Sequence, residues 1–231
     1  MKPFLVIPTI DGSITADTFA SLWHLARADL TFDPRVMAWN QDVVRVRNRA
    51  VAEFLKSDCT HLWFVDADVG FAPEIPAALF ASGLDFVAAT YPKKRILWGQ
   101  TPPVELASVA LQSGEVREVN GLHFKATELV PMGCTLLSRH MLTTLCNMQG
   151  PNAIAWYGDR YGGEIHKVPA LFNLEMRQRD DGELELLPED YSFTVHAKRC
   201  GFTPWVLMDA LCTHTGTMRF DVRKIMGEVV G

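Results

Sequence analysis

The chain has 231 residues, 48% of them hydrophobic and 21% charged, which is typical of a globular protein with one large domain or two small ones. Its net charge of −5 argues against a general affinity for nucleic acid but does not exclude a local basic patch. No apolar run approaches the roughly 20 residues that a membrane-spanning helix needs. The N-terminal segment lacks the apolar stretch and the cleavage site of a signal peptide.

The five cysteines, at positions 59, 134, 146, 200 and 212, are scattered and include no Cys-x-x-Cys pair. An odd number at such spacings indicates reduced thiols and not a disulfide framework or a zinc knuckle. We therefore expect a cytoplasmic protein.

The first 90 residues alternate between strands and helices. Strands are expected over 4–7, 36–39, 61–65 and 85–90, and helices over 15–28, 42–57 and 73–82. Asp42 suits the N-cap of the second helix, and Pro73 fits the first turn of the third. This alternation predicts an α/β fold with a mostly parallel central sheet and helices on both faces. Ligands of such sheets bind beyond the carboxyl ends of the strands, where residues 8–12 and 66–68 should meet.

The second half is more mixed and includes a small β region. The expected elements are a hairpin over 115–126, a strand over 129–137, a turn over 179–182, helices over 138–147 and 188–200, and a last strand over 204–208. Residues 149–170 are rich in Gly, Tyr, Trp and Pro, and we interpret them as a long loop. Long loops in compact domains are often lids or binding loops.

Asp66 and Asp68 directly follow the apolar strand His61–Val65. Alternate residues of a strand point to the same side, so the two carboxylates can converge just beyond its end. Because neighbouring carboxylates repel each other, a divalent cation that also binds phosphate oxygens is a suitable ligand for this pair. Asp is also common in ordinary turns, so the weight of this motif depends on its partners.

Arg45 and Arg47 lie near the start of the helix 42–57, where backbone N–H groups also favour anions. An arginine can hold a phosphate through two hydrogen bonds. Arg45, Asn48 and Arg49 share a face at helical spacing, whereas Arg47 points elsewhere. Arg45 is therefore the preferred anion contact, and the alternative for either arginine is a solvated helix face.

Three further groups are candidates for the same edge. His214 follows the last strand and is either a third metal ligand or an ordinary turn histidine. Glu189 and Asp190 occupy a first helical turn, where the dipole stabilises carboxylates without any catalytic role. Their functional interpretation is a general base or an anchor for an acceptor hydroxyl. Lys93 and Lys94 are either surface lysines or neutralise a departing phosphate.

A series of short motifs runs through nearly the whole chain in a fixed order. They are Ile7-Pro-Thr9, Arg45-x-Arg47-Asn48-x-Ala50, Phe64-Val-Asp-Ala-Asp68, Tyr91-Pro-Lys93, Pro131-Met-Gly133, Pro188-Glu-Asp-Tyr-Ser-Phe193, Gly201 and His214. In this order they resemble the GT-A fold of nucleotide-sugar glycosyltransferases, and they look closest to small, single-domain viral and bacterial members. A viral source would imply the host cytoplasm.

The resemblance implies one domain over 1–231. Residues 1–100 would bind the nucleotide sugar and the metal, and residues 101–231 would bind the acceptor, with 149–170 lying over the acceptor site. The implied site residues are Pro8, Thr9, Asp11, Arg45, Asn48, Asp66, Ala67 and Lys93 for the nucleotide sugar, Asp66, Asp68 and His214 for Mn²⁺ or Mg²⁺, and Asp190 with Glu189 for catalysis.

The implied reaction moves a sugar from a nucleotide diphosphate sugar, with UDP as the favoured carrier, to a hydroxyl of a glycan or another acceptor. The cation neutralises charge on the departing diphosphate, and the reacting carbon passes through an oxocarbenium-like state. The stereochemistry inverts if Asp190 deprotonates the hydroxyl, and retention stays open if Asp190 only positions the acceptor. The sequence does not indicate the sugar, the acceptor or the oligomeric state.

Three alternatives stay open. A sugar-phosphate nucleotidyltransferase usually has a Gly-rich basic loop after its first strand, whereas residues 8–12 contain one Gly and no Lys or Arg. A nucleotide-sugar-binding module without turnover would need neither the acidic pair nor the metal residues. A glycosyltransferase of modified DNA bases would need Lys93, Lys94 and Arg95 to cluster beside the cleft, and the net charge makes nucleic acid a disfavoured partner.

Overall fold

A computed structural model describes residues 2–28, 32–37, 42–97, 101, 103–107, 109–110, 114–179 and 181–216. Its helices are α1 (Ala16–Ala26), α2 (Val43–Lys56), α3 (Glu74–Ala81), α4 (Arg139–Asn147) and α5 (Glu189–Arg199), with a short 3₁₀ turn at Gly150–Asn152. None of the helices within these ranges is long and apolar enough to cross a membrane.

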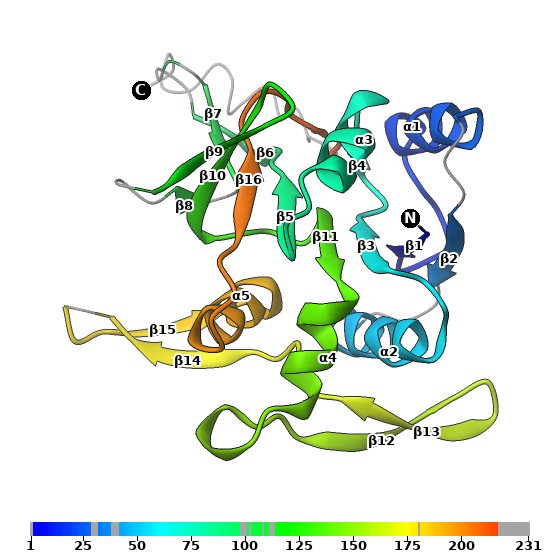
Figure 1. The fold of residues 1–231 in the computed structure, drawn as a ribbon, viewed down its shortest axis with the longest axis vertical. Helices are drawn as coiled ribbons and strands as arrows, with labels where there is room; N and C mark the ends of the chain where they lie inside the picture. Colours follow the sequence, from blue (N-terminus) through cyan, green and yellow to red (C-terminus); the bar gives the residue numbers. More distant parts are fainter. Residues whose placement is uncertain are drawn as a thin grey trace, which may run out of the picture.

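The described residues form a nine-stranded central sheet (Figure 1). Its order is β2 (Asp33–Met37), β1 (Pro3–Pro8), β3 (His61–Val65), β11 (Cys134–Ser138), β5 (Phe86–Ala89), β16 (Trp205–Leu207), β10 (Leu122–Leu129) and β8 (Val109–Ala110), with β9 (Val116–Val119) beside β10. Four two-stranded pairs surround it: β4 (Val69–Gly70) with β17 (Thr213–His214), β6 (Pro92–Ile96) with β7 (Val104–Leu106), β12 (Trp156–Tyr161) with β13 (Glu164–Pro169), and β14 (Glu175–Gln178) with β15 (Leu184–Leu187).

The sheet is mixed. β1 pairs in parallel with β2 and β3, and β16 pairs in parallel with β5. β11 lies between β3 and β5 and is antiparallel to both, so β2, β1, β3, β5 and β16 all run in one direction. β10 runs against β16, and β8 and β9 run against β10. The prediction of a mostly parallel sheet therefore describes the five co-directional strands, whose carboxyl ends share one edge.

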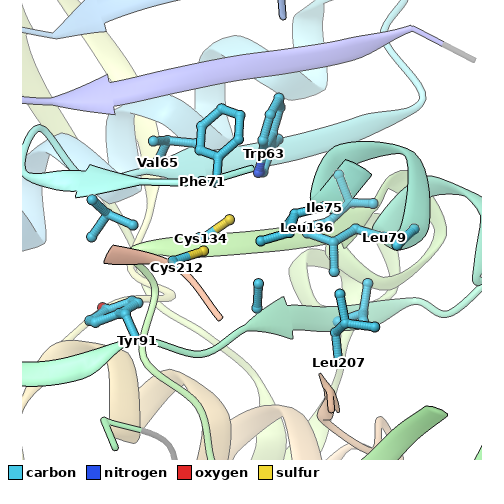
Figure 2. Close-up of a cluster of buried hydrophobic side chains, with 14 of the residues drawn as sticks. Trp63, Val65, Phe71, Ile75, Leu79, Tyr91, Cys134, Leu136, Leu207 and Cys212 are labelled. Atoms are coloured by element: carbon cyan, nitrogen blue, oxygen red, sulfur yellow. The ribbon is translucent and has the colours of Figure 1, made fainter. Parts of the chain in front are cut away.

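Helices cover both faces of the sheet, as the alternation predicted. Successive strand residues point to opposite faces, so Leu5 and Trp63 belong to a core with α1 and α3, whereas Phe4 and Phe64 belong to a core with α2, α4 and α5. Figure 2 shows part of the first core, in which Trp63 on β3 lies near Ile75 on α3.

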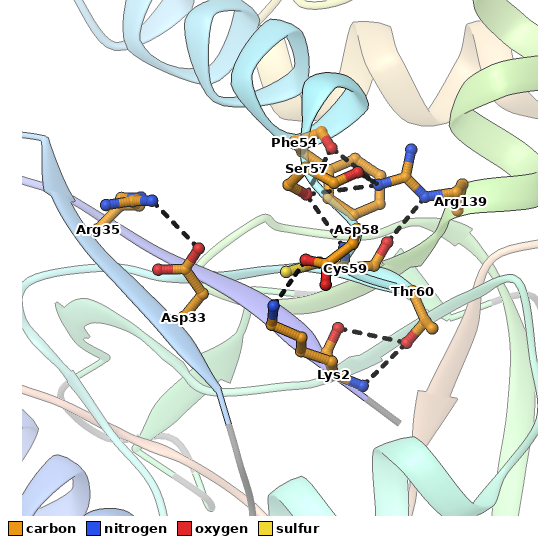
Figure 3. Close-up of polar contacts among 9 residues, drawn as sticks. All are labelled: Lys2, Asp33, Arg35, Phe54, Ser57, Asp58, Cys59, Thr60 and Arg139. Atoms are coloured by element: carbon orange, nitrogen blue, oxygen red, sulfur yellow. Dashed lines mark hydrogen bonds and ion pairs between the residues drawn. The ribbon is translucent and has the colours of Figure 1, made fainter.

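The guanidinium of Arg139 joins the end of α2 to the start of β3 (Figure 3). It donates hydrogen bonds to four backbone carbonyls and lies 4.4 Å from the centroid of the Phe54 ring. The four carbonyls are those of Phe54 (2.9 Å), Leu55 (3.3 Å), Ser57 (2.9 Å) and Cys59 (2.7 Å). Because a helix leaves its last carbonyls without intrahelical partners, this arginine caps α2 at the edge of the sheet opposite to the carboxyl ends.

Most expected elements are present, including the three N-terminal helices, the hairpin within 115–126 and the helices near 138–147 and 188–200. The expected strand 36–39 is observed over Asp33–Met37, and Ala38 and Trp39 lie outside the described residues. The expected strand 129–137 was too long, because β10 ends at Leu129 and β11 begins at Cys134.

The long loop predicted over 149–170 was wrong. Residues 156–169 form the hairpin β12–β13, with Tyr161 opposite Glu164. The turn between them is Gly162-Gly163, and both glycines have positive φ, at 59° and 86°. Two glycines between alternating polar and apolar residues are a strong hairpin signal, which the overall richness in Gly and Tyr obscured.

Candidate functional site

A cavity of about 770 Å³ opens at the carboxyl edge of the co-directional strands. It is walled by the loop after β1, the start of α2, the turn after β3, a lysine of β6 and the residues after β17. The lining residues are Pro8, Thr9, Ile10, Asp11, Ser13, Ile14, Thr15, Val43, Val46, Arg47, Asp66, Ala67, Asp68, Lys94, Thr215 and Gly216. The expectation that residues 8–12 and 66–68 meet at one edge is confirmed.

Backbone hydrogen bonds from three distant segments fix the turn Asp66–Asp68. They run from the Asp66 N–H to the Gly133 carbonyl (2.9 Å), from the Thr15 N–H to the Ala67 carbonyl (2.8 Å) and from the Thr215 N–H to the Asp68 carbonyl (2.9 Å). Because each residue of the turn is held from another part of the chain, the positions of the two carboxylates depend on the whole fold.

His214 is placed beside this turn by β17, in which Thr213 pairs with Gly70 and His214 with Val69 of β4. Its Nε2 lies 3.5 Å from Oδ1 of Asp68. Its Nδ1 lies 2.8 Å from the carbonyl oxygen of Pro92, which can only accept, so Nδ1 carries the proton of this bond. In the neutral ring, the Nε2 lone pair then faces Asp68, which is the orientation of a metal-bound imidazole held by a backbone carbonyl.

Asp68 is ionised under all ordinary conditions. Burial opposes the charged form, but the Lys94 ammonium and, in its protonated form, the His214 imidazole outweigh it and hold the pKa of Asp68 at about 2. Lys94 binds Oδ2 of Asp68, while His214 faces Oδ1. The carboxylate therefore already attracts positive charge at the position where a cation would bind.

Arg47, and not the predicted Arg45, lines the cavity. Its side chain is 4% exposed, and it bridges Asp66 (Nη2 to Oδ1, 3.2 Å) and Glu189 (Nε to Oε1, 3.2 Å). Its Nη1 has no hydrogen-bond partner among the described residues. The guanidinium also lies 5.2 Å from the centroid of the Phe64 ring. Arg47 thus connects the turn after β3 to the first turn of α5.

The prediction for Arg45 is corrected by its contacts outside the cavity. Arg45 and Arg49 both bind the carboxylate of Asp159 on β12, which is 1% exposed. Hydrogen bonds from these two arginines outweigh burial and lower the pKa of Asp159 to about 2. The face of α2 that carries Arg45 therefore holds the β12–β13 hairpin, and Arg45 does not line the cavity.

Asn48 and Lys93 also lie apart from the cavity lining. The Asn48 amide donates to the Phe172 carbonyl (2.9 Å) and accepts from the Phe172 N–H (2.8 Å), so it fixes the segment before β14. Lys93 pairs with Glu105 on β7 at 2.8 Å, and the next residue, Lys94, points to the cavity instead. Neither side chain lines the cavity, and their role as nucleotide-sugar contacts stays a prediction.

Glu189 and Asp190 begin α5 and do not line the 770 Å³ cavity. They lie on the far side of Arg47, and Glu189 binds that arginine directly. Burial, together with repulsion from Glu189, raises the pKa of Asp190 to about 6. Asp190 is therefore a carboxylate at neutral pH that retains an unusual affinity for a proton.

Asp66 does not join the expected metal triad, because its carboxylate is held by Arg47. Within the described part of the chain, no group of three or more His, Cys, Asp or Glu side chains is arranged to hold a metal. Asp68 and His214 remain as a carboxylate–imidazole pair, a donor set that suits Mn²⁺ and leaves positions for ligand oxygens. The residues present therefore fit a cation that shares its shell with a bound ligand.

The sequence favoured Arg45 over Arg47, although the spacing of α2 contains a signal that Arg47 is buried. Arg47 precedes Ala50, Val51 and Phe54 by three, four and seven residues, which is the spacing of one helix face. Those three residues are fully buried. A charged residue on the apolar face of a helix must be paired within the fold, so this spacing identifies Arg47 as a buried cation.

No family model and no curated protein matches this chain. Among solved structures it is similar to "Crystal Structure of A197 from STIV", with a TM-score of 0.52 and 15% sequence identity. The match covers 93% of this chain and 86% of that one. At this identity the likeness shows a shared α/β fold and carries no information about activity.

Proposed function

We propose that this protein is a metal-dependent glycosyltransferase of the GT-A type, which moves a sugar from a nucleotide diphosphate sugar, with UDP the favoured carrier, to a hydroxyl acceptor. The observation that supports it best is the 3.5 Å approach of His214, near the end of the described chain, to Asp68 in the turn after β3. A histidine that is oriented by a carbonyl and lies next to an ionised, cavity-lining aspartate suits a cation with a ligand bound to it.

The loop after β1 is a suitable wall for a base and ribose. Asp11 accepts hydrogen bonds from the backbone (2.9 Å) and hydroxyl (2.6 Å) of Ser13, and the Thr9 hydroxyl donates to the Ser13 carbonyl (2.8 Å). These bonds order the loop before any ligand binds, which lowers the conformational entropy lost on binding. Pro8, Thr9 and Asp11 therefore keep the nucleotide-contact role that the sequence suggested.

A divalent cation held by Asp68 and His214 would neutralise the negative charge that develops on the departing diphosphate. Arg47 would keep the carboxylates of Asp66 and Glu189 in fixed positions. The bond between the anomeric carbon and the diphosphate oxygen breaks, and the electron pair leaves with the nucleotide. The acceptor oxygen bonds to that carbon, and Asp190 takes the hydroxyl proton if the stereochemistry inverts.

Calorimetry with UDP and with GDP, each with and without Mn²⁺, tests the proposal. We expect one nucleotide to bind only when Mn²⁺ is present. Asp68→Asn should weaken this binding at least about 30-fold, because it removes the ionised ligand. Asp58→Asn makes the same charge change at a side chain that is 78% exposed and paired with Lys2, and it should leave the affinity unchanged.

Three results would contradict parts of this proposal. Binding of neither nucleotide, or equal binding with and without Mn²⁺, would remove the nucleotide-sugar site. Mn²⁺-dependent binding without sugar transfer or donor hydrolysis would favour a binding module.

A further inference from the structure

Lys94 and His214 contact the same carboxylate. The Lys94 ammonium binds Oδ2 of Asp68, and Nε2 of His214 lies 3.5 Å from Oδ1. An ammonium group and a divalent cation bind to the same lone pairs of a carboxylate. We propose that Lys94 is a tethered counter-ion that occupies the cation position on Asp68 in the free protein and leaves when a divalent cation binds. This inference rests on the proposed function, because it uses the same metal position.

One short strand, β6, supplies both Lys94 and the carbonyl that orients His214. The carbonyl of Pro92, the first residue of β6, accepts the hydrogen bond from Nδ1 of His214 at 2.8 Å. Lys94 is two residues further along β6 and lines the cavity. Because the imidazole is held by the backbone of β6 and the ammonium is carried by a side chain, Lys94 can leave without loss of the bond that orients His214.

The Lys94 side chain has room to move. It is 40% exposed, and the Asp68 side chain is 34% exposed. The residue packed against its stem is Gly216, where an added Cβ would lie 3.0 Å from the Lys94 Cδ atom. Ion pairs this open to solvent contribute little free energy, so a cation of twice the charge is able to displace the ammonium.

The neighbouring Lys93 provides a matched comparison. Its side chain is 39% exposed, but it pairs with Glu105 on β7 and does not line the cavity. Lys93→Met and Lys94→Met remove the same charge from adjacent positions on one strand. A difference between them therefore reports the contact with Asp68 and not the net charge of the protein.

The first test is a titration of each protein with Mn²⁺ alone, in which electron paramagnetic resonance measures the free ion. We expect Lys94→Met to bind Mn²⁺ roughly three- to tenfold more tightly than the unchanged protein, because the competitor is gone. Lys93→Met should stay within about twofold. Equal or weaker binding by Lys94→Met, or an equal gain in Lys93→Met, would overturn the inference.

The second test follows the ammonium itself in the unchanged protein. Acetic anhydride modifies free amines, and peptide mass spectrometry can report the rate at each lysine. Mn²⁺ at saturation should raise the acetylation rate of Lys94 at least about threefold and leave Lys93 unchanged, because displacement exposes the amine. An unchanged Lys94 rate in the Mn²⁺-bound protein would contradict displacement.

The two proposals fail in different ways. If no variant binds Mn²⁺, even with UDP present, the metal site and the proposed function fail together. If Mn²⁺ and UDP bind to the unchanged protein but Lys94 responds neither in affinity nor in labelling, only the counter-ion inference is lost.

Discussion

Arg47 is the residue on which most of the site's carboxylates depend. A buried charge is tolerated only when it is paired, and Arg47 pairs with Asp66 and Glu189 at 3.2 Å each. Asp190 adds a third negative group close enough for Arg47 to lower its pKa against the raising effects of burial and Glu189. The arginine thereby holds together acidic residues that are far apart in the sequence.

Asp190 gives a pH dependence whose sign follows from its raised pKa. Its ordinary value is 3.8 and its folded value is about 6, so the folded state binds the proton more tightly than the unfolded state. The contribution of the protonated Asp190 to the free energy of unfolding is fully present below pH 3.8 and is lost as the pH rises through about 6. At neutral pH the buried charge of Asp190 therefore lowers the free energy of unfolding.

We expect Asp190→Asn to stabilise the protein at pH 8 by on the order of 2 kcal/mol and to change stability little at pH 4. Urea denaturation of the metal-free protein at both pH values measures this difference. The pKa of Asp58 is lowered by its hydrogen bond from Lys2. The control variant Asp58→Asn should therefore show no stabilisation at pH 8. A loss of stability in Asp190→Asn at pH 8 would show that its carboxylate is held by favourable bonds.

At the scale of elements, the short pair β4–β17 decides whether His214 reaches Asp68. It contains two residue pairs, Thr213 with Gly70 and His214 with Val69. Gly70 is required for this approach, since a Cβ there would lie 2.6 Å from the Thr213 hydroxyl and 2.9 Å from the Asp17 Cβ. A side chain at position 70 must therefore displace the Thr213 side chain of β17 and the start of α1.

Gly70→Ala should leave the protein folded, at a cost of about 1–3 kcal/mol in stability. It should weaken Mn²⁺-dependent nucleotide binding at least about tenfold, because the displaced histidine no longer shares the cation with Asp68. Calorimetry and thermal denaturation measure the two effects. Gly158→Ala on β12 is the control, since its Cβ would meet only the Ile165 side chain at 3.1 Å. Unchanged nucleotide affinity in Gly70→Ala would separate β17 from the site.

Local patterns predicted the elements well where periodicity was strong, as in α2, where Asp42 caps the helix by accepting from the Arg45 N–H. They failed where long-range contacts decide the outcome. The Asp159 carboxylate on β12 reaches Arg45 and Arg49 on α2, and no local spacing reveals that contact. This is why the sequence did not indicate the contacts of Arg45, whereas Asp66 and Asp68 line the cavity and His214 lies 3.5 Å from Asp68.

At the scale of the whole molecule, the mixed sheet brings the site together. Five co-directional strands direct their carboxyl ends to one edge, and Gly133, the residue before the antiparallel β11, supplies the carbonyl that holds Asp66. Cys134, the first residue of β11, lies in the same core as Cys212, the residue just before β17 (Figure 2). The packed core thus fixes the backbone on both sides of the proposed cation position.

The most direct test of this account is pulsed electron paramagnetic resonance of Mn²⁺ bound to the protein together with UDP. We predict nitrogen coupling from one imidazole and phosphorus coupling from the diphosphate on the same ion. His214→Ala should abolish the nitrogen coupling, and His24→Ala, an exposed histidine of α1, should retain it. Nitrogen coupling that survives in His214→Ala, or an ion with phosphorus but no nitrogen coupling, would contradict the cation site between Asp68 and His214.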